Sequence, residues 1–224
     1  MTITKKFTSP ALPLPAQIYD VMSENDKSRV LRLYFNLLDR YLNDLTIILN
    51  GGGPGLGIVF PHIAASDSTD QRTADNTATV VNFNTLESGF GWTLNSPGSA
   101  TAAIAGVYTI RYSIQFANTD NAAHTATVWL KKQNVDVPNS ATIFSIPARK
   151  SASIPGFICG YSEATFEVAV GDEIELYWAT DQADVVSPAA DGILLFHDAA
   201  QASPFARPAI PSVIGSIVWV SALT

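Results

Sequence analysis

Three histidines are the residues of this sequence best suited to metal binding or acid–base chemistry. His62, His124 and His197 stand far apart and lack the HxH or HxxxH spacing that sets two imidazoles beside one ion. No GxSxG segment is present, so nothing indicates the nucleophile of an α/β-hydrolase. The sequence therefore predicts neither a zinc site nor a catalytic nucleophile.

The acidic segment SDSTDQRTAD is the next candidate for chemistry. Its residues Asp67, Asp70 and Asp75 lack the every-second-residue spacing of an EF-hand loop, and no glutamate stands at the closing position. We interpret the segment as a solvated loop rather than a cation site. We expect no catalytic residues, no bound metal and no cofactor.

The glycine-rich segment GGGPGLG, residues 51–57, does not fit a phosphate-binding loop. It is too short and wrongly spaced for GxGxxG, and it lacks the Gly-Lys-Ser/Thr of a P-loop. We interpret it as a flexible joint between two parts of the chain.

Aromatic residues and the single cysteine also invite a functional interpretation. Tryptophans can stack on sugar rings, but three of the four lie inside strand patterns, which favours core or interface packing. The four tryptophans are Trp92, Trp129, Trp178 and Trp219. Cys159 has no partner for an internal disulfide, and its apolar neighbours Phe157 and Ile158 predict a small core residue.

Composition narrows the class of protein. The chain has 224 residues, 47% of them hydrophobic and 15% charged, which is ample apolar mass for a core. Lys and Arg number 13 against 20 Asp and Glu, and the net charge of −7 disfavours nucleic acid and anionic membranes. No apolar run approaches the roughly 20 residues of a membrane span, and MTITKKFTSP lacks a signal-peptide h-region. We expect no membrane insertion and folding in a reducing cytosol.

Strands are predicted from Gly57 onward, where the dominant hydrophobic period is two. In GVYTIRYSIQF the apolar residues alternate with polar ones, as in a strand with one buried face. The expected inward residues are Tyr108, Ile110, Tyr112, Ile114 and Phe116. FEVAVGDEIELYWA predicts a hairpin that turns at Gly171 and Asp172. Nine or so short strands separated by Gly, Pro, Asn and Asp clusters predict an antiparallel sandwich or barrel.

One amphipathic helix is predicted from about Glu24 to Asp44, within residues 23–50. Ser23 and Asp26 resemble a capping box at its start. An apolar heptad series runs along it at Leu31, Tyr34, Leu38, Tyr41, Leu45 and Ile48. The stripe is wider than a two-stranded seam needs, so it buries either against its own domain or against copies of itself.

An extended arm is predicted over residues 1–22. Pro10, Pro13 and Pro15 restrict the backbone and remove hydrogen-bond donors, which disfavours a helix. Its apolar side chains are expected to dock on this fold or on a partner. They are Leu12, Leu14, Ile18 and Val21.

The strand segments carry a resemblance to a known family. FPHIAASDSTDQRTADNTATVVNFNT, AIAGVYTIRYSIQF, VWLKKQNVDVPNSATIFSIP and VAVGDEIELYWAT resemble, in order and spacing, the jelly-roll domains of virion structural proteins of tailed bacteriophages. A more distant similarity is to the trimeric jelly rolls of the complement C1q and tumour necrosis factor (TNF) class. There GxYxxxxxxxF and GDxIxL strands recur, here at Gly106, Tyr108 and Phe116 and at Gly171 to Leu176.

The resemblance implies an antiparallel jelly-roll sandwich over residues 58–224, preceded by the arm, the helix and the joint. It implies a non-enzymatic homotrimer with the helix stripe at the threefold axis, anchored by its arm to other virion proteins of capsid, neck or tail. Tyr34 and Tyr41 depart from simple coiled-coil packing. The alternative that the helices pack under the sheet domain therefore stays open. We expect the protein in the virion, after synthesis in the host cytoplasm.

Three alternatives remain at this point. A receptor-binding fibre tip would touch host surface glycans through loops such as residues 118–124 or 181–191. A tailspike-like depolymerase would need a catalytic signature or a β-helix repeat, neither of which the sequence has. A secreted C1q-like module would carry a signal peptide.

Overall fold

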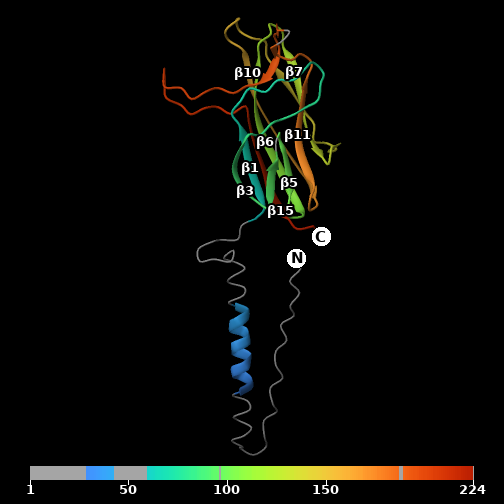
Figure 1. Cartoon of the computed structure of the whole chain (residues 1–224), viewed down its shortest axis with the longest axis vertical. Helices are drawn as coiled ribbons and strands as arrows, with labels where there is room; N and C mark the ends of the chain where they lie inside the picture. The colour runs from blue at the N-terminus through green and yellow to red at the C-terminus, as the bar shows by residue number, and fades with distance from the viewer. Residues whose placement is uncertain (1–28, 43–59, 96, 187–188, 224) are drawn as a thin grey trace, which may run out of the picture. The chain divides into compact units, whose positions relative to one another are not determined.

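The computed structural model describes residues 29–42, 60–95, 97–186 and 189–223. Clustering of the chain gives two units, Met1–Val59 and Phe60–Thr224. The described part of the first unit is an α-helix over residues 29–42, and that of the second is built of strands (Figure 1). Several predictions lie outside the described residues: the arm, the joint, and the positions Leu12, Leu14, Ile18, Val21, Leu45 and Ile48.

Sheet A is one layer of the second unit. Its strands follow the order β10-β6-β15-β1-β3, and β14 pairs with the far end of β6. All pairings within it are antiparallel. The strands are β1 (His62–Asp67), β3 (Thr85–Phe90), β6 (Gly106–Asn118), β10 (Gly156–Val168), β14 (Ile193–Leu195) and β15 (Val213–Ser221).

Sheet B is the other layer, on the opposite side of the unit in Figure 1. Its main order is β4-β5-β11-β7-β8, with β2 paired to β11 and β9 to β7. The strands are β2 (Thr79–Val80), β4 (Trp92–Asn95), β5 (Ser99–Ala102), β7 (His124–Lys132), β8 (Val135–Asp136), β9 (Thr142–Ile146) and β11 (Glu173–Thr180). A separate short pair joins β12 (Val185–Val186) to β13 (Ala189–Ala190).

The strand pairings are nested along the chain. The first strand, β1, pairs with the last, β15, while β5 pairs with β11, β6 with β10, and β7 with β9. A folded-over hairpin wrapped around two layers in this way is a jelly roll. The predicted mainly β, antiparallel jelly-roll class is therefore confirmed.

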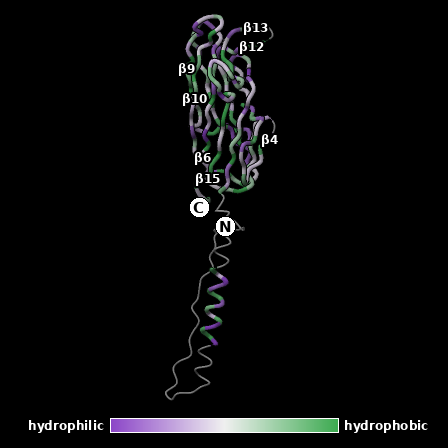
Figure 2. Tube along the Cα trace, turned by 90° about the vertical axis from the view of Figure 1, so that its left-hand side faces the viewer, coloured by the Kyte–Doolittle hydropathy of each residue, from purple (hydrophilic) through white to green (hydrophobic). Residues whose placement is uncertain are grey.

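The core lies between the two sheets. The alternation predicted for GVYTIRYSIQF is confirmed, because Tyr108, Tyr112 and Phe116 are buried while Arg111 is exposed. Figure 2 shows hydrophobic and hydrophilic residues mixed throughout the strand unit. Trp92 packs edge-on against Tyr108 at 5.0 Å between ring centroids, and Trp178 is fully buried.

The predicted hairpin across Gly171 and Asp172 is wrong. Its two halves, β10 and β11, lie in different sheets, so the turn crosses the sandwich instead of joining paired neighbours. Gly171 adopts a φ of 85°, and its N–H donates to the Ala102 carbonyl at 2.8 Å. A β10–β11 pair would require both strands on one face of the core. The period-two pattern is the same whether the chain crosses to the other sheet or turns back in the same one, so it does not distinguish the two cases.

The prediction that Cys159 is a core residue is also wrong. Cys159 is exposed on β10, where it lies opposite Gln115 of β6. Its neighbours Phe157 and Tyr161 are exposed on the same face, while Gly160 is buried. The alternation of side chains along a strand places every second residue outward whatever its polarity.

Candidate functional site

The outer face of sheet A, turned away from the core, is the candidate interaction site. Cross-strand register sets its side chains in rows, one of which holds Tyr161, Ser113, Ile214 and Ser66. Ile214 is 50% exposed and Tyr161 58% exposed. A second row includes Val218, 41% exposed. Isoleucine, valine and tyrosine thus share an uncovered sheet face with small hydroxyl side chains.

The charged side chains of this face are one ion pair and two further carboxylates: Glu87 of β3, which accepts the Ser66 hydroxyl at 2.7 Å, and Glu167, which is exposed on β10. Arg111 Nε lies 3.0 Å from Glu163 Oε2, across the β6–β10 pairing, and both side chains are about half exposed. The Tyr161 hydroxyl also donates to Glu163 Oε2, at 3.1 Å. Ser216 and Ala64 continue the same row with small neutral side chains. The pair is internally neutral, and Glu87 adds a negative charge beside Ser66.

The outer face of sheet B is organised differently. Glu175 lies opposite Lys131, and Tyr177 opposite Trp129. Lys131 Nζ stands 4.2 Å from the Tyr177 ring centroid, and Trp129 Nε1 donates to Asp136 Oδ1 at 2.8 Å. Burial raises the pKa of Glu175, and the charge of Glu173 raises it further, while Lys131 opposes both. Here aromatic and charged side chains are partnered with one another.

The sequence contained a signal for the face of sheet A that the prediction missed. VIGSIVWVS, which forms β15, is apolar at both alternating sets of positions: Val213 and Ile217 are buried, and Ile214 and Val218 are exposed. A strand that is apolar on both sides is typical of burial on both faces. FICGY on β10 has the same property at Phe157.

The helix presents apolar side chains as well. Of the predicted interface residues, Tyr34, Leu38 and Tyr41 are half-buried, and Leu31 is exposed. Leu33, Phe35 and Leu37 are also exposed, and Figure 2 shows both hydrophobic and hydrophilic segments along the helix. Which of these residues meet another chain stays a prediction.

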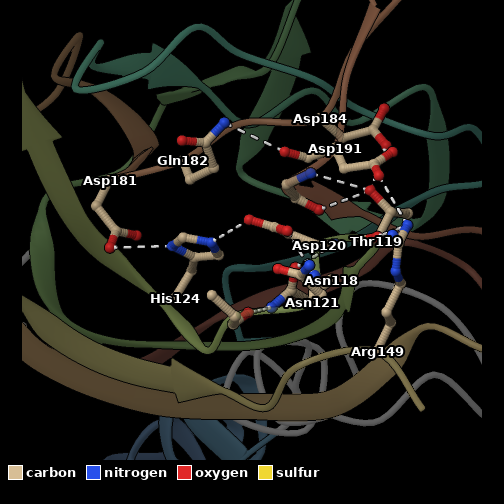
Figure 3. Close-up of polar contacts among 12 residues, drawn as sticks. Asn118, Thr119, Asp120, Asn121, His124, Arg149, Asp181, Gln182, Asp184 and Asp191 are labelled. Carbon is tan, nitrogen blue, oxygen red and sulfur yellow. Dashed lines mark hydrogen bonds and ion pairs between the residues drawn. The ribbon is translucent and has the colours of Figure 1, made fainter. Parts of the chain in front are cut away.

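A polar network ties together the loops at one end of the jelly roll (Figure 3). His124, the first residue of β7, lies between two carboxylates. Its Nε2 is 2.8 Å from Asp120 and its Nδ1 is 3.3 Å from Asp181. Burial lowers the pKa of His124, but the hydrogen bonds and charges of the two aspartates outweigh it and raise the pKa overall.

The two aspartates respond in the opposite direction. The hydrogen bond to His124 lowers the pKa of Asp120. Burial raises the pKa of Asp181, but the Thr125 N–H and His124 outweigh burial and lower it overall. The charged forms of all three groups therefore stabilise one another.

Arg149 connects further loops at this end of the jelly roll. Arg149 Nη1 donates to the Thr119 carbonyl at 2.6 Å and to Asp191 at 2.7 Å. The Thr119 hydroxyl donates to Asp184 at 2.9 Å, and Asp184 also pairs with Arg72 at 2.7 Å. Loops from both sheets are thereby held in one arrangement.

The contacts of His124 are made with carboxylates. His124 has carboxylates on both ring nitrogens, and no serine or cysteine is hydrogen-bonded to it among the described residues. Among residues 29–42, 60–95, 97–186 and 189–223, no group of three or more His, Cys, Asp or Glu side chains is placed to hold a metal ion. The network fixes loop positions and offers exposed polar groups for recognition.

The remaining predicted polar residues lie elsewhere. The ring of His62 contacts the Phe60 carbonyl and the Ser88 hydroxyl, each at 2.9 Å. The acidic segment is not simply solvated. Asp67 is buried and accepts the Thr69 N–H at 2.7 Å, and Asp70 and Asp75 accept the N–H groups of His197 and Ala183. These aspartates join distant loops. The helix is not long and apolar enough to cross a membrane over its described residues.

Comparison with solved structures gives similar chains of low identity. The Eiger TNF structure from S. frugiperda is 15% identical, with a TM-score of 0.45 over 74% of this chain and 96% of that one. The globular domain of the zebrafish complement 1qA protein is 11% identical, with a TM-score of 0.42 over 73% and 99%. No protein family and no curated protein matches the sequence. The jelly-roll class of this chain follows from its nested strand pairing.

Proposed function

We propose that this chain is a virion structural protein of a tailed bacteriophage. It acts as a homotrimeric fibre or decoration component that is anchored by its N-terminal arm and displays the jelly roll outward. It uses no cofactor and catalyses no reaction. The resemblance of its strand segments to phage jelly-roll proteins supports the virion assignment.

The observation that carries self-association is the outer face of sheet A. Monomers rarely leave apolar side chains gathered on a regular sheet face, and such surfaces mark protein–protein contacts. The face bears Ile214, Val218 and Tyr161. A copy of the same chain offers a surface of the same character, which suits a symmetric assembly.

The mass of the purified protein in solution tests this assembly. Light scattering at micromolar concentration is expected to give three times the 23.9 kDa of one chain. A mass of one chain at that concentration contradicts self-association.

Anchoring is tested by truncation. We expect a protein lacking residues 1–22 to remain folded and soluble, because the jelly roll has its own core, and to be absent from particles assembled in its presence. Incorporation at normal occupancy would instead assign attachment to the jelly roll.

Host-glycan recognition is the second candidate function. It is favoured by the network of Figure 3, which holds the loops beside Asp120, Asp181 and Asp191 in fixed positions and leaves their carboxylates partly exposed. Fixed polar groups on a rigid scaffold lower the entropic cost of binding a sugar. Asp181→Ala is expected to abolish binding of the intact protein to host cells. Unchanged binding would exclude these loops.

A further inference from the structure

An extended hairpin projects from the sheet A side of the jelly roll, drawn in red in Figure 1. We define residues 198–210 as the hairpin arm. It follows β14 and leads into β15, and two isolated bridges join its sides, Asp198 with Ile210 and Gln201 with Arg207. Each bridge has two backbone hydrogen bonds, of 3.0 and 2.8 Å and of 3.1 and 2.9 Å. The hairpin arm is therefore a formed element rather than an irregular loop.

The surface of the hairpin arm is neutral and largely apolar. Residues 199–206 are all exposed, and Phe205 near the tip is 64% exposed. The sequence between the bridges is rich in alanine and proline. Asp198 and Arg207 are its charged residues, and they form an ion pair with each other. An element of this composition is suited to contact an apolar surface rather than a charged polymer.

The root of the hairpin arm connects it to the outer face of sheet A. Phe196, just before the arm, packs against Phe157 of β10, with ring centroids 5.1 Å apart. Phe157 lies on that outer face and is itself exposed. The arm is thus continuous with the surface that we propose meets other copies of the chain.

We propose that the hairpin arm is a clasp that grips a second copy of this chain, with Phe205 seated on the outer face of its sheet A. The inference rests on the self-association in the proposed function. On the acceptor, Ile214 and Val218 flank the small Ser216 along β15, and Ala64 lies beside Ser216. Arg111 lies on the other side of Ser216, where the ion pair with Glu163 balances its charge, so the arm and this part of the face are both without an unpaired charge.

A preformed clasp is suited to this role for two reasons. Its internal ladder means that little backbone entropy is lost on binding. In a closed ring each chain both donates and receives an arm, so every contact is repeated once per subunit.

Site-specific photocrosslinking tests the proposal. A benzophenone amino acid replaces Phe205 in the full chain, and a matched sample carries it at Ile143, which is 71% exposed on β9 of sheet B. Irradiation is expected to link two copies through position 205, with the acceptor peptide from β15 or β1, and to give no such product through position 143. Products within one chain, or acceptor peptides from sheet B, would overturn the clasp.

Light scattering on the same sample separates the two levels of inference. An assembled protein without intermolecular links at position 205 overturns the clasp and leaves self-association standing. A protein with the mass of one chain overturns both.

A substitution gives an independent readout. Phe205→Ser is expected to weaken assembly on the order of tenfold or more, as loss of an aromatic anchor does, with the far-ultraviolet circular dichroism unchanged. Val135→Ser, at a 68% exposed position of β8, is the control and should leave assembly unaltered. Equal assembly of the Phe205→Ser variant and the control would contradict the clasp.

Discussion

On sheet B, the outward side chains of the central strands contact one another, since Lys131 lies over Tyr177 and Trp129 donates to Asp136, while Ile143 and Val135 are exposed on its outer strands. On sheet A, the corresponding face leaves Ile214 and Val218 exposed beside the ion pair between Arg111 and Glu163. Both sheets contribute buried residues to the core, so the two sheets differ on their outer faces.

The comparison shows that the outer faces of the two sheets differ in how their side chains contact one another. In the centre of sheet B, the Tyr177 ring is covered by the Lys131 cation and lies against Trp129. Sheet A retains apolar area whose removal from water would favour an assembly. The proposed assembly therefore turns sheet A inward and sheet B outward.

The largest effect is expected from a charge on the face of sheet A. Ile214→Asp would place an unpaired carboxylate in the interface, at a cost of several kcal/mol, so the assembly should dissociate by a factor of more than about a hundred. Ile143→Asp makes the same change on sheet B, at a position that is more exposed. Sedimentation velocity of both variants measures the difference. Equal association states would remove the distinction between the two faces.

A smaller effect is expected from the ion pairs of the two faces. Glu163→Gln leaves Arg111 without its carboxylate partner in a covered face, which should raise the dissociation constant on the order of tenfold. Asp136→Asn on sheet B, 3.8 Å from Lys131, should change it little, because exposed pairs contribute little. A concentration series of light scattering gives both constants. A larger change in Asp136→Asn would reverse the assignment of the faces.

The smallest effect concerns the network that joins the sheets at the loop end. The pKa of His124 is raised above its ordinary 6.5, so its stabilisation is present below that pH and is lost as pH rises through the folded pKa. The pKa values of Asp120 and Asp181 are lowered from 3.8, so their stabilisation is lost only as pH falls below that value. Between roughly pH 4 and 6.5 all three contribute.

We therefore expect the melting temperature of the wild-type protein to exceed that of the His124→Gln variant by roughly 2–4 °C at pH 5.5. The difference between the two melting temperatures should be smaller at pH 8.5. His62→Gln is the control, since the His62 ring contacts a carbonyl and a hydroxyl rather than carboxylates. Association should not follow this pH dependence, because the network lies in the loops and not on the face of sheet A. An equal gap at both pH values would contradict the charged network.

The elements that the sequence predicted well are those with one buried side. In β6, strict alternation follows from a face against the core and a face with polar residues, so the inward set from Tyr108 to Phe116 was identified correctly. β11 was recognised for the same reason. Period-two patterns report which residues are buried but not which sheet a strand joins, and this is why the Gly171 turn was misjudged.

The candidate site was less accessible to sequence reasoning. Ile214 and Val218 have the same residue types as core positions, and only the register with β6 and β1 shows that they point outward. Cys159 was placed in the core by its apolar neighbours, one of which, Phe157, is itself exposed. Association surfaces resemble cores in composition, so the two are separable only after the fold is known.

Cys159 provides the most direct test of the central claim, that the outer face of sheet A is covered by other copies. It is the one cysteine of the sequence, it is exposed in the single chain, and it lies on this face opposite Gln115. The measurement is the rate at which a maleimide labels native protein at a concentration where light scattering gives the assembled mass. We predict that the wild-type protein reacts much more slowly than the folded Ile214→Asp variant. Equal rates in the two proteins would show that the face stays open to solvent in the assembly, and would contradict the account.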